Sequence, residues 1–101
     1  MANTAKVLFR GAATTNTATT LYTVPSATTT VAANIAITNT GSSAYTFTLG
    51  FAGTSLHTTT AIAANTTIYI DCKQVLEATN TITGGASNIA VNFHISGMEI
   101  A

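Results

Sequence analysis

Apolar and polar residues alternate within residues 31–51, and this alternation narrows the folds open to the chain. A period of two is typical of a β-strand with one buried face, and it occurs here in two successive runs. The apolar positions are Val31, Ala33, Ile35 and Ile37 in the first run, and Tyr45, Phe47, Leu49 and Phe51 in the second. Residues 39–43 between the runs contain Gly41 and small hydroxyl side chains, which favour a hairpin loop. We therefore predict an antiparallel hairpin whose apolar face is covered by a second sheet.

Shorter runs along the rest of the chain predict the remaining strands. These runs cover residues 6–10, 20–24, 58–65, 66–72, 80–83 and 88–96. In the run 6–10, Val7 and Phe9 are expected to face the core. In the run 66–72 these residues are Ile68, Ile70 and Cys72, and in the run 88–96 they are Ile89, Val91, Phe93 and Ile95. Residues 97–101 are expected to extend the last strand or to pair with the first.

Turn signals separate these runs and indicate the fold class. Ala52-Gly53-Thr54 and Gly84-Gly85 are predicted turns, and Pro25 ends a strand because it lacks an N–H group. Residues 73–78 have helical propensity, but six residues are too few for a stable helix, so we expect a single turn or an extended corner there. The 101 residues are thus predicted to form one domain, residues 1–101, with an all-β fold. We expect a single antiparallel β-sandwich of about eight short strands, jelly-roll-like.

Charge excludes several classes of partner. Charged residues make up 6% of the chain, against about 25% in ordinary soluble domains, and the net charge is zero. Such a chain lacks the cationic surface that nucleic acids and membrane surfaces attract, so neither is an expected partner. A surface with so little self-repulsion favours assembly with copies of itself or with a larger particle, and the alternative is a robust, weakly charged β domain.

The reactive residues do not form a catalytic or metal-binding pattern, and we expect no enzyme activity, metal or cofactor. Three carboxylates are far apart in the sequence, and one cysteine and two histidines lack the spacing of a metal site. His57 or His94 could form a catalytic set with Cys72 and Asp71 across the fold. Cys72, however, follows Ile70 on the apolar face of its strand, which favours an inert buried thiol.

Threonine pairs and tyrosines suggest two binding functions as alternatives. Thr-x-Thr pairs could order water on an ice-binding face, although they occur at irregular intervals. Sugar sites usually stack an aromatic ring on the sugar, and Tyr22 and Tyr69 are the tyrosines expected on outer faces. Solvent-facing threonines and packed edge tyrosines explain both features more simply.

Three segments resemble small β-rich virion proteins of tailed bacteriophages. They are residues 21–26 (Leu-Tyr-Thr-Val-Pro-Ser), residues 75–82 (Val-Leu-Glu-Ala-Thr-Asn-Thr-Ile) and residues 94–100 (His-Ile-Ser-Gly-Met-Glu-Ile). The likeness covers nearly the whole chain from Val7 onward, and it rests on turns and strand ends. Where that family often has Gly-Asp before the last pair of strands, this chain has Thr79-Asn80.

The resemblance implies a capsid decoration (cement) protein that binds the outside of the assembled shell and bridges capsid subunits. Its expected partners are the major capsid protein and copies of itself. A homotrimer is the first expectation for this self-association, and a dimer is the second. The alternatives are a tail or fibre-tip structural or adhesion module and a carbohydrate-binding module. Residues 1–6 lack a cationic region followed by a long apolar run, so we expect no signal peptide, synthesis in the host cytoplasm and a place on the virion. The candidate contact residues are Lys6, Arg10, Tyr22, Tyr69, Met98, Glu99 and Ile100.

Overall fold

The computed structural model describes residues 3–70 and 73–101, and these residues form an all-β fold. The described part contains nine strands and no helix, so nothing in it is a helix that could cross a membrane. The strands are β1 (Asn3–Ala12), β2 (Thr19–Thr23), β3 (Thr29–Asn39), β4 (Tyr45–Phe51), β5 (Thr54–Ile62), β6 (Thr66–Ile70), β7 (Gln74–Leu76), β8 (Thr81–Ala86) and β9 (Val91–Ile100). The short strand β7 lies in the segment predicted as a turn or an extended corner, and it is extended.

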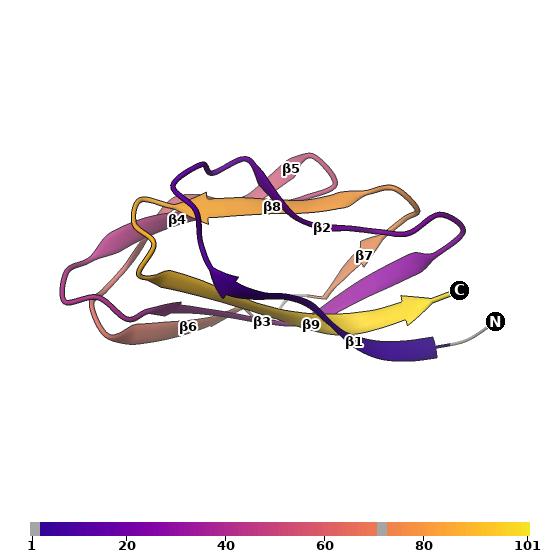
Figure 1. The fold of residues 1–101 in the computed structure, drawn as a ribbon, viewed down its shortest axis with the longest axis horizontal. Coiled ribbons are helices and arrows are strands. Elements are labelled where there is room, and N and C mark those ends of the chain that lie inside the picture. Colours follow the sequence, from indigo (N-terminus) through magenta and orange to yellow (C-terminus); the bar gives the residue numbers. More distant parts are fainter. Residues whose placement is uncertain (1–2, 71–72) are drawn as a thin grey trace.

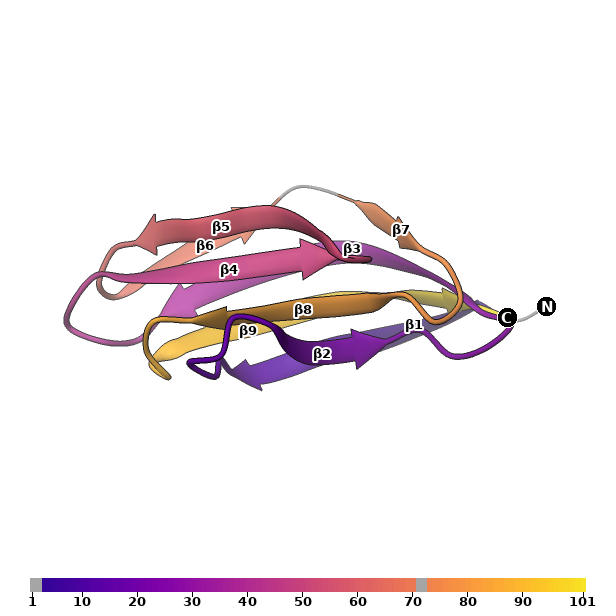
Figure 2. The ribbon, with the colours of Figure 1, turned by 90° about the horizontal axis from the view of Figure 1, so that it is seen from above.

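The strands form two sheets that pack face to face, as the two views show (Figure 1, Figure 2). Sheet A has the order β1-β9-β3-β6, with β7 also paired to β3, and sheet B has the order β2-β8-β4-β5. Every recorded pair is antiparallel. The predicted antiparallel β-sandwich is therefore confirmed.

The strand pairs are nested about one turn, which defines a jelly roll. β4 pairs with β5, β3 with β6 and β7, β2 with β8, and β1 with β9. The central turn is Ala52-Gly53, whose φ angles of 52° and 82° match a type I′ hairpin. The chain is thus one long hairpin rolled into a sandwich, with β6 and β7 acting as a single interrupted strand of an eight-stranded jelly roll.

The core lies between the two sheets and is built from the predicted alternating residues. Phe47 of sheet B and Phe93 of sheet A are both buried, and their rings meet edge to face with centroids 6.4 Å apart. Val91 and Ile95 are also completely buried, as predicted for the last strand. Ile89 was predicted inward as well, but it precedes β9 and is 67% exposed. The inward pattern of the last strand therefore begins at Val91.

The predicted hairpin of residues 31–51 is wrong, although both of its strands exist. β3 belongs to sheet A and β4 to sheet B, so residues 40–44 cross from one sheet to the other. Both strands still direct apolar side chains into the same core. An alternating pattern is satisfied equally well by two paired strands and by two strands that face each other across a sandwich.

The side chain of Asn39 fixes this crossing. Asn39 is completely buried, and its Nδ2 donates hydrogen bonds to the carbonyl oxygens of Ser43 (2.8 Å) and Ile62 (3.2 Å). Its Oδ1 accepts a hydrogen bond from the N–H of Gly41 at 2.9 Å. Because a buried amide is costly unless it is hydrogen-bonded, these three bonds explain how a polar residue ends a core strand.

Two β-bulges change which residues of the long strands face the core. In β1 the pairing with β9 shifts between Val7 and Phe9, so Leu8 is buried and Val7 is 45% exposed. In β3 a shift between Ala32 and Asn34 buries Ala32 in place of the predicted Ala33. A bulge adds one residue to a strand and therefore reverses the alternation beyond it.

The predicted turn at Gly84-Gly85 is also wrong, because both glycines lie inside β8. A Cβ atom at Gly85 would lie 2.3 Å from the carbonyl oxygen of Asn16, and one at Gly84 would lie 2.8 Å from that of Thr48. The glycines therefore allow neighbouring backbone to approach the strand closely.

Candidate protein interaction surface

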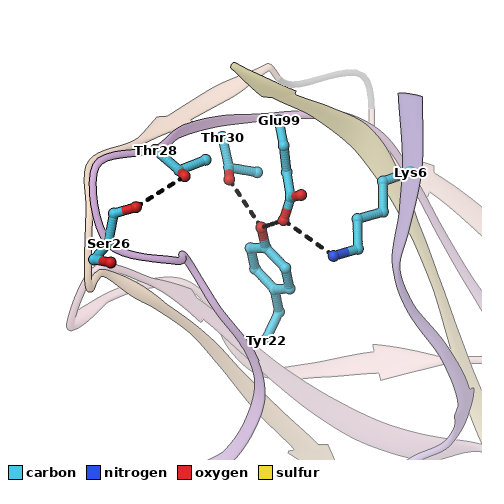
Figure 3. A network of polar contacts seen from close by, with 6 residues as sticks. All are labelled: Lys6, Tyr22, Ser26, Thr28, Thr30 and Glu99. Carbon is cyan, nitrogen blue, oxygen red and sulfur yellow. Dashed lines mark hydrogen bonds and ion pairs between the residues drawn. The ribbon is translucent and has the colours of Figure 1, made fainter. Parts of the chain in front are cut away.

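Three of the candidate contact residues come together at the end of the sandwich where both termini lie (Figure 1, Figure 3). The Lys6 ammonium lies 3.2 Å from Oε2 of Glu99, and the Tyr22 hydroxyl donates a short hydrogen bond to the same oxygen. The Tyr22 hydroxyl also lies 2.9 Å from Oγ1 of Thr30. We call Lys6, Tyr22, Thr30 and Glu99 the terminal cluster.

The terminal cluster connects the two sheets. Tyr22 belongs to sheet B, whereas its three partners belong to β1, β3 and β9 of sheet A. Tyr22 was expected on an outer face, but it is half-buried and points at the opposite sheet (Figure 3). Its hydroxyl is therefore engaged within the chain.

The cluster also changes the acidity of its members. The hydrogen bond from Tyr22, and then the Lys6 ammonium, lower the pKa of Glu99 below its ordinary value of 4.5, because both contacts favour the carboxylate. Burial, followed by the hydrogen bond to Glu99, raises the pKa of Tyr22. Both shifts favour the pair that the structure shows, an ionised Glu99 carboxylate that accepts a hydrogen bond from a protonated Tyr22 hydroxyl.

We expect Glu99→Gln to destabilise the protein at neutral pH and to have no effect in strong acid. The folded protein lowers the pKa of Glu99, so the carboxylate contributes stability above about pH 4.5 that is lost as the pH falls through the folded value. Urea unfolding curves between about pH 7 and about pH 2 measure this difference. Glu77→Gln, which alters an exposed carboxylate, is the control. A gap between wild type and Glu99→Gln that stays constant down to the lowest pH would refute the assignment.

The remaining candidate contact residues lie on the outer face of sheet A or at its end. The strand registers place Arg10, His94, Ala36 and Tyr69 in one line across four strands. Met98 and Ile100 point to the same outer face, because Val91, Phe93 and Ile95 of the same strand point inward. Tyr69 is 77% exposed, as predicted for an outer face.

A second line across this face consists entirely of apolar residues. The registers align Ala5 of β1, Met98 of β9, Val31 of β3 and Val75 of β7, and we call these four residues the apolar row. Val75 is 67% exposed and Met98 is 37% exposed. Val7 lies one line further along, opposite Ser96. Four of the six large apolar residues exposed in the described part of the chain therefore lie on one face: Val7, Tyr69, Val75 and Met98.

The sequence did not predict three members of the apolar row. Val31 was expected in the core, and Ala5 and Val75 were not singled out. Val31 faces outward because the bulge in β3 reverses the alternation between it and Ile35. The position of Val75 beside an outward Val31 depends on a pairing between strands 44 residues apart, which no local pattern encodes.

The outer face of sheet B has a different character, because hydroxyl and glycine residues cover it. A shallow groove of about 250 Å³ lies there, lined by Thr17, Ala18, Thr48, Gly50, Gly53, Thr54, Ser55 and Thr83. None of these lining residues is aromatic, so the groove lacks the ring on which a sugar would stack. Two of the Thr-x-Thr pairs lie on the neighbouring strands β4 (Thr46 and Thr48) and β8 (Thr81 and Thr83). Thr48, however, is opposite Gly85, and Thr83 is opposite Gly50. The threonines of the two strands therefore do not form facing ranks.

Of the residues considered for catalysis, the structure describes the two histidines, and these lie in different sheets. His57 packs against the ring of Phe47, with centroids 5.3 Å apart, and contacts the hydroxyl of Thr60. His94 is exposed on the outer face of sheet A. Asp71 and Cys72 lie outside the described residues. Within residues 3–70 and 73–101, no three His, Cys, Asp or Glu side chains are grouped to hold a metal ion.

Comparison of the chain with models of protein families, with curated proteins and with solved structures finds no match.

Proposed function

We propose that this protein is a bacteriophage capsid decoration protein that stabilises the assembled shell by contact alone. The observation that carries this proposal is the outer face of sheet A, where apolar side chains are exposed together on a chain of zero net charge. Monomeric soluble proteins rarely expose contiguous apolar patches larger than a few hundred Å², so a face that gathers several exposed apolar side chains favours a surface that another protein covers. The jelly roll supports the proposal at the level of the fold, since this architecture recurs in viral capsid proteins.

The proposed mechanism is mass action on the shell. A subunit that binds only the assembled shell lowers the free energy of that state and so opposes its dissociation. A rigid sandwich with a broad, weakly charged surface suits this role, because binding depends on contact area and needs no chemical group. A tail or fibre-tip module would use the same surface properties at another place on the virion.

Co-expression with the major capsid protein encoded in the same genome tests the proposal. We expect this chain to sediment with assembled shells, to stay separate from unassembled capsid protein, and to raise the temperature at which the shells dissociate.

A matched pair of variants tests the face that carries the proposal. Val75→Asp should abolish binding to the shells, because Val75 lies in the apolar row. Ile89→Asp, at an equally exposed apolar residue outside this face, should bind like wild type. The proposal is wrong if the chain does not bind the shells or if the genome encodes no shell protein. Co-sedimentation with tails would instead identify the chain as a tail or fibre-tip module.

A further inference from the structure

We propose that the outer face of sheet A is covered by a second copy of this chain, in a two-fold dimer whose axis runs parallel to the strands between β9 and β3. This inference deepens the proposed function, on which it rests only in treating the chain as an assembly subunit. The dimer is then the form that binds the shell, and the apolar row supports shell binding by holding the two copies together. Of the two oligomeric states predicted from the sequence, this proposal takes the dimer in place of the trimer. An isologous two-fold contact needs one self-complementary surface, and this face has that property.

The complementarity follows from comparing the residues at the two ends of each line across the face, because the axis places these residues over each other. A two-fold axis parallel to the strands places β1 over β6 and β7 of the second copy, and β9 over β3. In the apolar row, the small side chain of Ala5 then meets Val75, and Met98 meets Val31. Small residues thus lie opposite larger ones, as the interdigitated core of a two-sheet sandwich requires.

The same axis places Arg10 opposite an aromatic ring. Arg10 is the one formally charged residue among the paired residues that point to this outer face. Arg10 and Tyr69 occupy opposite ends of a single line, so each Arg10 guanidinium is placed over the exposed Tyr69 ring of the other copy. A cation over an aromatic face is favourable, and here the contact occurs twice per dimer. An axis perpendicular to the strands, along the apolar row, would leave both residues uncovered.

The size of the face agrees with a stable dimer. Four strands about 4.8 Å apart and about ten residues long, at about 3.3 Å per residue, cover roughly 630 Å². Two such faces would bury roughly 1,250 Å² in total, which lies at the lower end of the range of about 1,200–2,000 Å² for specific interfaces.

The edges of the described sheets are poor alternatives for self-association. The edge strand β1 is interrupted by a bulge and carries Lys6 and Arg10, and the opposite edge is divided between β6 and β7. In sheet B, pairing shifts within both β2 and β5, the edge strands. Bulges and charges on edge strands prevent pairing with another chain, so the faces are left for association.

Light scattering after size-exclusion chromatography of the isolated protein tests the dimer. We expect a mass of about twice 10.3 kDa that persists on dilution. Val75→Asp should give a monomer, whereas Ile89→Asp, which carries the same change at a residue that is also 67% exposed, should remain a dimer. A wild-type monomer, a trimer, or equal effects of the two substitutions would overturn the proposal. Because no shell is present, this outcome is independent of the shell-binding experiment.

Cross-linking tests the direction of the axis. In a Cys72→Ser background, an equimolar mixture of Ala5→Cys and Val75→Cys proteins should be joined by a short bis-maleimide that spans the about 10 Å between stacked sheets. Each variant alone is the control and should not be cross-linked. The axis parallel to the strands places the introduced cysteine of one copy and the same cysteine of the other copy at opposite ends of the face. Self-cross-linking of each variant alone, without cross-linking in the mixture, would replace this axis with the perpendicular one and contradict the proposal.

A double-mutant cycle tests the contact between Arg10 and Tyr69. Arg10→Ala and Tyr69→Ala should each weaken dimerisation about 5-fold, and the double variant should be no weaker than either single variant. Effects that multiply in the double variant would show that the two residues do not meet.

Discussion

Ile95→Ala should lower the free energy of unfolding by about 2–5 kcal/mol. Ile95 is completely buried in β9, the strand that lies between β1 and β3 in sheet A. Removing three carbons there leaves a cavity that two rigid sheets cannot close, so the loss includes both the transfer of the side chain and the cavity. Urea unfolding followed by circular dichroism measures the change, with the slope of the transition expected to stay constant.

Ile89→Ala is the matched control for this substitution. The sequence alone predicted both isoleucines on the inward face of one strand, whereas the structure leaves Ile89 67% exposed in the turn before β9. Its replacement should change the free energy of unfolding by less than about 0.5 kcal/mol. Equal losses from Ile95→Ala and Ile89→Ala would support the uninterrupted strand of the sequence pattern and contradict the observed start of β9.

Gly97→Ala should destabilise the protein by about 3 kcal/mol through overpacking. A Cβ atom at Gly97 would lie 2.0 Å from the carbonyl oxygen of Val31 and 3.1 Å from Cα of Ala32. Both atoms belong to the backbone of β3, next to its bulge, so they cannot move without disturbing the pairing of β3 with β9. The change in the midpoint of urea unfolding reports the loss.

Gly11→Ala provides the comparison in the same sheet. A Cβ atom at Gly11 would meet only the ring of Phe9, at an ordinary contact distance of 3.6 Å. We expect this variant to unfold like wild type or slightly later, because alanine also has less conformational freedom than glycine in the unfolded chain. If Gly97→Ala proved as mild as Gly11→Ala, the close approach of β3 to β9 at this point would be incorrect.

The sequence predicted the layered architecture well, because alternation reports directly which face of a strand is buried. Phe47, Leu49 and Phe51 all face the core, and so do Val91, Phe93 and Ile95. The turn at Ala52-Gly53 was also predicted, since it depends on residues that are adjacent in the chain, although its type I′ conformation was not. These features require no knowledge of which strand lies beside which.

Features that depend on which strand pairs with which could not be predicted from the sequence. The pairing of β3 with β9 in place of β4 has no signal within residues 31–51, and the buried Asn39 that fixes the crossing looks like an ordinary turn residue. Bulges are equally hidden: nothing in Lys6-Val7-Leu8-Phe9 indicates that Leu8 and not Val7 enters the core. A single inserted residue changes the face of a side chain without changing the composition of the strand.

The candidate surface shows the same limit. Lys6 and Glu99 are separated by 92 residues of sequence, and only the pairing of the first strand with the last brings them to 3.2 Å. The apolar row likewise combines residues of four strands. Exposed apolar residues could be suspected one at a time, but the line that they form follows only from the register.

The position of β9 has a consequence for the order of events during synthesis. Among the described strands this one is the last in chain order, yet it lies in the interior of sheet A, where β1 has no other recorded partner. β1 therefore stays without a partner in sheet A until β9 has been synthesised. Such long-range closure is slow compared with the pairing of adjacent strands. A nascent chain that stops before residue 91 accordingly has no strand in sheet A with which β1 can pair.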